Sequence, residues 1–426
     1  MLRRPGDQDG FSLVELMVAV AIFALVFAAV SLGMGRVLDV NRNSRNRSAA
    51  AYLAARGIEE ARSAAFASVV PGSRSCDATT PQASCPFSIP TSPYTVTRDV
   101  SWVAPGATSS TCNVPSGSSG SALAYKRVTI TVQWPNMGTV APVTSQTLLT
   151  PPAEAYDPNN GHIIARLFDH NAQPLAGQTV SISGPASDSQ VSTEDGCAFF
   201  AYLDPGTYTV TLNTSGYVGR QGDQPATETV AVVAAQTTVA QLSYDRAATL
   251  QVGLVPPANS VLPDGIAATV YNTNLTVQTK VFTGSGLSRT LGPLFPFTSG
   301  YEVWAGSCSD AEPSVLGGSR ATPLIAAPGG TASGSAPLGA VDVLVTRLGL
   351  PVNGATVQAE HDPSSGCPSG MATLTTSTRT GSDGRIRLAL PYGRWKIRAT
   401  AITSALSGTV TVSQAAPIQS TTVAVL

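Results

Sequence analysis

Residues 10–34 read GFSLVELMVAVAIFALVFAAVSLGM, and this stretch decides what the N-terminal part of the chain can form. Positions 16–34 hold no charged side chain. Nineteen such residues, at about 1.5 Å each and extended by the apolar residues before them, match the roughly 30 Å thickness of a bilayer's hydrocarbon core. A cleaved secretory signal has a shorter apolar core of about 7–15 residues and a different flank. The stretch therefore predicts a membrane-spanning helix over 11–35.

One acidic residue, Glu15, lies inside this apolar segment. An acidic side chain costs about 2.5–3.5 kcal/mol near the centre of a membrane helix and less near its end. A plain N-terminal anchor has no use for it, although that anchor remains an alternative interpretation.

Gly10, Phe11 and Glu15 resemble the last leader residue, the first mature residue and the fifth mature residue of type IV pilins and pseudopilins. The resemblance implies that residues 1–10 are a prepilin leader. A prepilin peptidase would cut after Gly10 and methylate the new amino terminus at Phe11. The cationic amine created there and the Glu15 carboxylate of a stacked neighbouring copy would attract each other strongly in the apolar medium. The resemblance also implies other pilin subunits, pilus assembly machinery and the membrane as partners.

The charges that flank the span disagree with an exported C-terminal part. Two arginines precede the span and four follow it within 36–47, so the positive-inside rule alone would keep the long part of the chain in the cytoplasm. The resemblance nevertheless requires the leader to face the cytoplasmic peptidase, and the lysine-poor, β-rich remainder is typical of an exported surface protein. We therefore expect a single-pass membrane protein whose exported part later reaches the cell surface or a pilus.

The segment 36–150 is expected to form a pilin-like globular head. No proline occurs between position 36 and Pro71, so the helix is expected to continue to about Ala67. Strands are predicted over 94–103, 126–134 and 143–149, and 126–134 alternates apolar and polar side chains. The resemblance implies that the helix packs on an antiparallel sheet of these strands. The residues expected on the packed helix face are Val37, Tyr52, Ile58, Ala61 and Ala65.

Composition describes a turn-rich, mostly β protein and argues against an enzyme. A hydrophobic content of 43% argues against disorder, and a net charge of −1 argues against a protein that neutralises nucleic-acid phosphates. With 3 His and 6 Cys, the chain has few of the side chains from which hydrolytic or metal sites are built. We expect no catalytic residues, no metal, no cofactor and no nucleic-acid partner.

After a linker over 151–161, the sequence repeats itself. PLAGQTVSI, EDGCAFFAYL and DPGTYTVTL within 174–212 correspond to PVNGATVQA, SDGRIRLAL and PYGRWKIRA within 351–399. Asp-Gly is typical of hairpin turns and Pro-Gly or Pro-x-Gly of tight turns. We expect small antiparallel β-sandwiches over 162–245 and 341–426, with a divergent module over 246–340 that carries the related FTSGYEVWAG at 297–306.

These repeated segments resemble the carboxypeptidase regulatory-like and Cna-B-like β-sandwich families. The resemblance implies a fold and no activity, because the zinc pattern His-x-x-Glu follows none of His162, His170 and His361. The fold class expected for the whole chain is an α+β pilin-like head, a long N-terminal helix on an antiparallel sheet, followed by all-β sandwich modules.

The cysteines fit disulfides better than a metal site. No Cys-x-x-Cys pair occurs, and export makes disulfide bonds the default. Cys85 is expected to pair with Cys76 or Cys112 in the head. Cys197, Cys308 and Cys367 fall one to a module, so some bridges cross modules or some thiols stay free.

The remaining candidate residues have structural explanations. The three histidines are expected at turns or on the surface. Asp169, Asp195 and Asp383 are expected to bond within turns rather than to bind calcium, because no dense acidic loop surrounds them. Four aromatic residues are expected in sandwich cores, with carbohydrate stacking as the alternative: Tyr301, Trp304, Tyr392 and Trp395.

The expected function is that of a minor type IV pilin or pilin-like subunit that displays its β modules for filament initiation or adhesion, with a surface ligand such as a carbohydrate. About 275 residues after the head would be hard to repeat along a tightly packed filament, so a tip or low-copy position is expected. Two alternatives remain open. One is a pseudopilin of a type II secretion or competence apparatus, and the other is a membrane-anchored surface binding protein that never polymerises.

Overall fold

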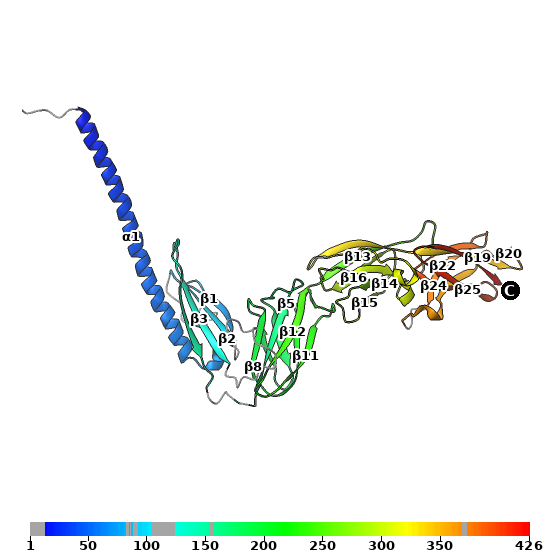
Figure 1. The fold of residues 1–426 in the computed structure, drawn as a ribbon, viewed down its shortest axis with the longest axis horizontal. Helices are drawn as coiled ribbons and strands as arrows, with labels where there is room; N and C mark the ends of the chain where they lie inside the picture. Colours follow the sequence, from blue (N-terminus) through cyan, green and yellow to red (C-terminus); the bar gives the residue numbers. More distant parts are fainter. Residues whose placement is uncertain are drawn as a thin grey trace, which may run out of the picture. The chain divides into compact units, whose positions relative to one another are not determined.

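The computed structural model describes residues 13–81, 85, 87, 93–103, 124–152, 157, 159–368 and 373–426. The described residues up to Asp157 form one compact unit and those from Asn159 onward form another (Figure 1). The predicted processing residues Gly10 and Phe11 and the predicted disulfide residue Cys112 lie outside the described residues. The fold class is the expected one: an N-terminal apolar helix and a small sheet, followed by β-sandwiches.

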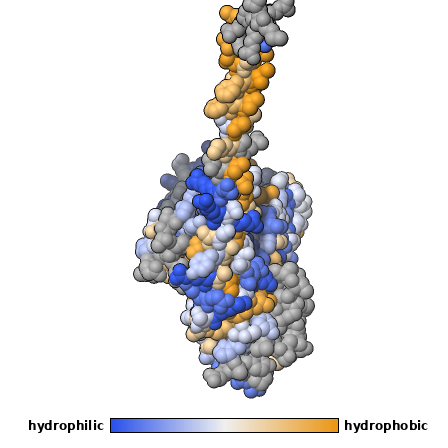
Figure 2. Space-filling view, turned by 90° about the vertical axis from the view of Figure 1, so that its left-hand side faces the viewer, coloured by the Kyte–Doolittle hydropathy of each residue, from blue (hydrophilic) through white to orange (hydrophobic). Residues whose placement is uncertain are grey.

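Helix α1 is one continuous helix of 51 residues, Leu13–Ser63, drawn in blue in Figure 1. Its segment Leu13–Ser31 has a mean hydropathy of 2.8 and none of it is buried. Figure 2 shows this hydrophobic surface along the helix. The helix ends earlier than the predicted Ala67, because Ala65 adopts a ψ of 136° and a short 3₁₀ turn, Phe66–Ser68, follows.

The C-terminal half of α1 packs on a four-stranded antiparallel sheet in the order β1-β2-β3-β4. The structure confirms the three predicted strands, with small shifts at their ends. β1 was not predicted, because four of its five residues are exposed and show no apolar alternation. The strands are β1 (Gly72–Cys76), β2 (Thr95–Val103), β3 (Tyr125–Gln133) and β4 (Val143–Leu149).

The helix face that meets the sheet differs from the predicted one. Ile58 and Ala61 are buried as expected, but Val37, Tyr52 and Ala65 are exposed. The buried face follows the four-residue spacing of Ala50, Ala54 and Ile58, whereas Tyr52 lies about 200° around the helix from Ala50. Small side chains allow the close approach. A Cβ added at Gly57 would lie 3.2 Å from Ile130 of β3.

Strand β3 supplies the centre of the head's core. Val128, Ile130 and Val132 are fully buried, which confirms the alternation read from the sequence. Lys126 extends the same buried face, and its Nζ donates to the carbonyl of Phe66, just after the helix, at 2.7 Å. Burial lowers the pKa of Lys126 to about 8, and its ammonium lies over the rings of Phe66 and Trp102. This lysine therefore attaches the end of the helical segment to the sheet.

The first module is a sandwich of two four-stranded sheets, β10-β12-β5-β8 and β11-β9-β6-β7. Phe200, Tyr208 and Tyr244 fill its core and are fully buried. Its strands are β5 (Gly161–Phe168), β6 (Thr179–Ser183), β7 (Asp188–Val191), β8 (Cys197–Leu203), β9 (Gly206–Leu212), β10 (Tyr217–Gly219), β11 (Ala226–Val232) and β12 (Thr237–Arg246).

The middle module packs two three-stranded sheets, β16-β13-β18 and β15-β14-β17. Its strands are β13 (Ala248–Val255), β14 (Ala268–Tyr271), β15 (Thr279–Phe282), β16 (Ser288–Leu294), β17 (Glu302–Ala305) and β18 (Thr331–Pro337). The last module has β19 paired with β20, β23 and β26, and a second sheet in the order β22-β21-β24-β25. Its strands are β19 (Gly339–Arg347), β20 (Leu350–Pro351), β21 (Thr356–His361), β22 (Thr373–Arg379), β23 (Arg385–Leu390), β24 (Gly393–Thr400), β25 (Ser404–Val412) and β26 (Ile418–Val425).

Two details of the predicted sandwiches are wrong. The sandwiches are mixed rather than antiparallel, because the first and last strands of each module pair in parallel: β5 with β12, β13 with β18 and β19 with β26. The Asp-Gly dipeptides form tight turns, with Gly196 and Gly384 at φ of 71° and 70°, but they are not hairpins. Each turn joins strands that lie in different sheets, β7 to β8 and β22 to β23. A turn dipeptide fixes the local bend, whereas strand pairing depends on where the chain goes next.

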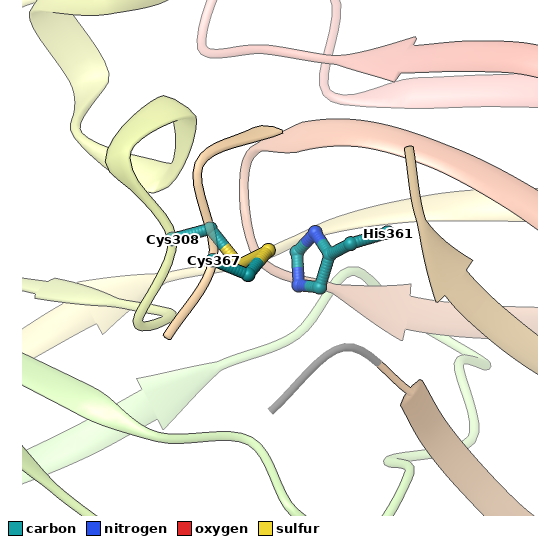
Figure 3. Close-up of side chains that lie close together, drawn as sticks. All are labelled: Cys308, His361 and Cys367. Atoms are coloured by element: carbon teal, nitrogen blue, oxygen red, sulfur yellow. A yellow bond between two sulfur atoms is a disulfide. The ribbon is translucent and has the colours of Figure 1, made fainter. Parts of the chain in front are cut away.

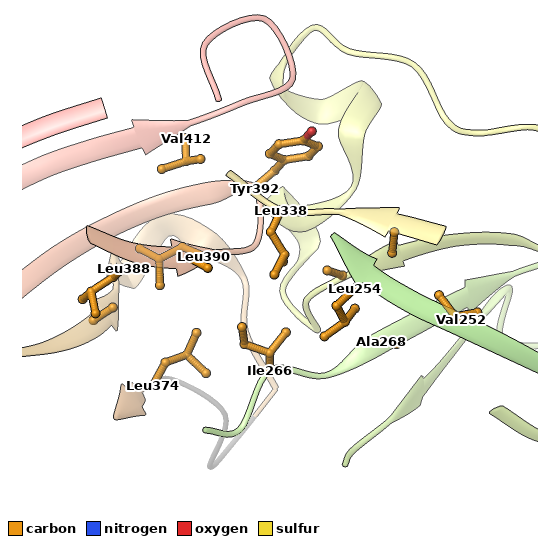
Figure 4. Packing of buried hydrophobic residues seen from close by; sticks show 14 of the residues in the cluster. Val252, Leu254, Ile266, Ala268, Leu338, Leu374, Leu388, Leu390, Tyr392 and Val412 are labelled. Carbon is orange, nitrogen blue, oxygen red and sulfur yellow. The ribbon is translucent and has the colours of Figure 1, made fainter. Parts of the chain in front are cut away.

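The middle and last modules share a single hydrophobic core (Figure 4). Only Leu338 separates β18 from β19, and its side chain is buried among both modules. Backbone hydrogen bonds also cross the junction. The Val261 N–H donates to the Arg387 carbonyl at 2.8 Å, and the Ala389 N–H donates to the Val261 carbonyl at 2.9 Å. These two modules therefore form one packed body.

Candidate functional site

The N-terminal half of α1 presents an unusual amount of exposed apolar surface. Between Leu13 and Val30, twelve large hydrophobic side chains are 52–74% exposed. Leaving this much surface in water is unfavourable by about 25 cal/mol per Å² of apolar area. The segment is long and apolar enough to cross a bilayer, and its surface is of the kind that packs against lipid or other apolar helices.

Glu15 lies in the first turn of the described helix and is exposed. The sequence holds no basic residue between Glu15 and Arg36, which lies about 30 Å further along the helix axis. A cation for Glu15 within the apolar region must therefore come from the amino-terminal side or from another molecule.

Five of the six cysteines lie in the described part of the chain, and all five are disulfide-bonded. Cys76 at the end of β1 pairs with Cys85, which is one of the two pairings expected for the head. Cys308 pairs with Cys367, 59 residues later, and joins the middle module to the last. Cys197 of β8 is also disulfide-bonded. For these later cysteines the sequence left open bridges between modules or free thiols, and the structure shows a bridge between modules.

Figure 3 shows the Cys308–Cys367 disulfide beside His361. Together with the buried Asp310 and Trp395, these residues form a cluster that we name the module clasp. The ring centroids of His361 and Trp395 are 3.6 Å apart. Asp310 is fully buried, and its Oδ2 accepts a hydrogen bond from the backbone N–H of Arg394 at 2.9 Å. The clasp thus adds a covalent bond and a polar bond to the shared hydrophobic core.

The clasp brings potential metal ligands together but does not offer them to a metal. Ligand atoms of Cys308, His361 and Cys367 lie within 4.8 Å of one another. Metal binding needs thiolates, and both sulfur atoms are tied up in the disulfide.

A second group of potential ligands, Asp169, His170 and Asp245, is held by hydrogen bonds within the fold. Asp169 Oδ1 accepts bonds from the backbone N–H groups of Asn171 and Gln173, both at 2.8 Å. Asp245 Oδ2 lies 2.7 Å from His170 Nδ1 and accepts the His170 backbone N–H at 3.0 Å. These hydrogen bonds account for the three side chains as parts of a turn. Whether the group binds a metal is not tested by them, and the expectation of no metal stays a prediction.

The histidines do not all lie where the sequence suggested. His170 does lie in a turn. His162 is buried on β5, where its Nδ1 accepts the Tyr202 N–H at 3.1 Å, and His361 ends β21 inside the clasp, so the expectation of turn or surface positions is wrong for both. Both rings pack against aromatic side chains, and this packing, which the sequence does not reveal, decides their positions.

The predicted turn roles of the aspartates are confirmed. Asp383 Oδ1 accepts the N–H of Arg385 at 3.1 Å, Asp169 closes its own turn as described, and Asp195 accepts a bond from the Thr193 hydroxyl. The alternative of carbohydrate stacking is wrong for the four aromatic residues considered. All four side chains are buried in sandwich cores: Tyr301, Trp304, Tyr392 and Trp395.

Acidification is expected to destabilise the body formed by the middle and last modules through His361. Burial lowers the pKa of His361 from 6.5 to about 4, and the nearby Asp310 carboxylate opposes this only in part. The unfolded chain therefore binds a proton that the folded chain does not, between pH 6.5 and 4. Stability is fully present above pH 6.5 and falls by roughly 3 kcal/mol as the pH drops to 4.

Urea unfolding between pH 7 and 4 measures this loss. His361→Phe keeps an aromatic ring against Trp395 and should have a shallower pH dependence across the same interval. An unchanged slope in that variant would exclude His361 as the cause.

Comparisons with known proteins locate one family motif. A family model described as the prokaryotic N-terminal methylation motif matches residues 6–31. No curated protein matches the chain. The chain thus carries a pilin-like leader followed by the apolar helix described above.

Three solved structures with some likeness to this chain illustrate the comparison. The Bacillus anthracis TIE protein is 14% identical, with 78% of this chain and 70% of that chain covered, at a TM-score of 0.21. The streptococcal ancillary pilin is 10% identical over 71% of this chain and 81% of that chain, at a TM-score of 0.18. BcpA, the major pilin subunit of Bacillus cereus, is 10% identical over 62% and 99%, at a TM-score of 0.20. Scores this low carry no argument about fold or function.

Proposed function

We propose that this protein is a minor type IV pilin or pilin-like subunit. In this proposal the chain is cut between Gly10 and Phe11, assembled through α1, and displays its β modules for filament initiation or adhesion. Its role is structural and not catalytic. The observation that carries the proposal is the combination of a prokaryotic N-terminal methylation motif over 6–31 with a helix whose apolar half is wholly exposed.

The two halves of α1 differ in what they contact, and this difference supports separate roles in folding and in assembly. The half after residue 49 is occupied by its own head, through Ala50, Ala54, Ile58 and Ala61. The apolar segment Leu13–Ser31 at the other end of the helix is not buried against any described part of the chain. A subunit built in this way can keep its head folded while its free half-helix moves from the membrane into a bundle of other helices.

Glu15 supports assembly rather than simple anchoring. Its carboxylate needs a cation inside an apolar medium, and the chain supplies none between Glu15 and Arg36. Cleavage after Gly10 would create an amine at Phe11, and stacking of subunits would bring that amine to the Glu15 of a neighbour.

The size of the exported part supports a low-copy or tip position. The second unit comprises the described residues from Asn159 to Leu426, folded as β-sandwich modules. Repeating such a bulk on every subunit would conflict with the close spacing of helices in a filament core. The kinship of the modules with carboxypeptidase regulatory-like and Cna-B-like sandwiches is part of the proposal, and it rests on the repeated sequence segments.

Mass spectrometry of the mature amino terminus tests the proposal. We expect protein recovered from cells to begin with an N-methylated Phe11. Protein from cells that lack the prepilin peptidase should keep Met1 and serves as the matched control. Finding residues 1–10 intact in peptidase-containing cells would contradict the proposal and favour a membrane-anchored protein that does not polymerise.

A further inference from the structure

A groove of about 510 Å³ lies where the middle module meets the last. Asn259 and Val261 of the middle module form one side. The last module contributes Arg379 at the end of β22, Arg385 and Arg387 on β23, and Asp342 on β19. We name this feature the arginine groove. Ligand sites occur preferentially at such junctions between packed modules.

The arginine groove has an excess of positive charge. Among its lining residues, three arginines face one carboxylate, Asp342. That carboxylate is already committed to Arg387, whose Nε and Nη2 donate to its two oxygens at 2.6 and 2.9 Å. The excess is local, because the whole chain has a net charge of −1.

The other two guanidinium groups are available to a ligand. Arg379 and Arg385 are both exposed. Arg379 uses only Nη1, which donates to the Gly354 carbonyl at 2.9 Å. Near Arg385, the Asp383 carboxylate accepts the backbone N–H of Arg385. The Arg385 side chain also attracts the Asp342 carboxylate, but that carboxylate accepts its hydrogen bonds from Arg387.

The wall behind these arginines is held in place. Arg387 also donates through Nη1 to the carbonyl of Ala258 at 3.1 Å, which links β23 to the middle module. Together with the backbone bonds at Val261, this fixes the spacing between the two sides of the groove. A rigid site loses less entropy when it binds a ligand than a mobile one does.

We propose that the arginine groove binds the anionic groups, carboxylate or sulfate, of an acidic polysaccharide. The planar fork of a guanidinium group matches the paired oxygens of such groups. The groove is open to solvent, so a polymer can lie across it without having its ends enclosed. Among the described residues that line it there is no aromatic ring, and aromatic rings are the surfaces on which proteins stack nucleic-acid bases.

This inference deepens the proposed function, because it names the ligand class that the displayed modules would hold. Its test nevertheless does not depend on assembly. The full chain, purified in detergent micelles, is titrated with polygalacturonate as the carboxylate probe, heparin as the sulfate probe and neutral dextran as the control. A failed titration with normal filament incorporation would overturn the groove alone, whereas an uncut leader would overturn the proposed function alone.

We expect at least one acidic probe to bind, more weakly at high salt, and dextran not to bind. The double variant Arg379→Ala/Arg385→Ala should lower the affinity at least about tenfold, because it removes two charge-assisted contacts. Arg246→Ala, which removes an exposed arginine of β12 outside the groove, is the matched control and should bind like the wild type.

Three results would overturn the proposal. They are the absence of binding by both acidic probes, an equal affinity of the double variant and the wild type, and equally tight binding of a single-stranded DNA oligonucleotide. The melting temperature of each variant confirms that it is folded, and it should change little because both substituted side chains are exposed.

Discussion

A Glu15→Ala variant is expected to insert into the membrane at the wild-type level but to be incorporated into filaments at least about tenfold less. The proposed partner of Glu15 is the Phe11 amine of an adjoining subunit. Removing one member of a buried ion pair typically costs about 3–5 kcal/mol, because the other charge stays unpaired in an apolar medium. Insertion is spared, since removing an acid from an apolar helix favours the membrane. Immunoblots of sheared filaments and of carbonate-washed membranes measure the two quantities separately.

Glu59→Ala is the matched control for this experiment. Glu59 lies on the same helix, beyond the apolar half, and forms an exposed ion pair with Arg62 at 2.9 Å. Exposed pairs of this kind contribute about 0–1 kcal/mol, so incorporation should be unchanged. Wild-type incorporation of the Glu15→Ala variant would remove the role assigned to this carboxylate.

A Cys308→Ser/Cys367→Ser variant is expected to lose about 4 kcal/mol of unfolding free energy, according to the loop-entropy relation for cysteines 59 residues apart. The affected transition is that of the body formed by the middle and last modules. A melting temperature lower by roughly 10 °C would correspond to this loss. Calorimetry with and without a reducing agent measures it, because the reductant should reproduce the effect on the wild type.

The head provides the comparison for this disulfide. Cys76→Ser/Cys85→Ser opens a loop with a sequence separation of only 9, for which the same relation gives about 3 kcal/mol. These cysteines lie in the other compact unit, so the head transition should move while that of the modules stays. A module transition that is insensitive to loss of the Cys308–Cys367 bond would show that the shared core alone holds the two modules together.

Strands with a strong period of two could be predicted from the sequence. β3 lies where alternation placed it, and Trp395 of β24 lies in its sandwich core as expected. β1 could not be predicted, because its polar residues become a strand only through pairing with β2. The parallel pairs were missed for a related reason: β5 and β12 are brought together by the whole chain between them and leave no local signal.

The candidate sites differ in the same way: some are defined by neighbours in the sequence and others only by the fold. Glu15 could be found from the sequence alone, because its neighbours in the chain define the apolar medium around it. The module clasp could not be found in this way, since Cys308, His361 and Trp395 come from separate parts of the chain. The arginine groove likewise depends on the position of Asp342 beside β23, which strand pairing decides.

The parallel pairing of first and last strands has a mechanical consequence. In the last module, β19 and β26 are joined by one parallel ladder that runs from Ala340 to Arg347 on β19. Tension that enters at the beginning of β19 and leaves at the end of β26 pulls these strands past each other lengthwise. All the bonds of the ladder then resist together in shear, instead of parting one by one as they would in a peeled hairpin. A protein that tethers a cell against flow would gain resistance to rupture from this arrangement.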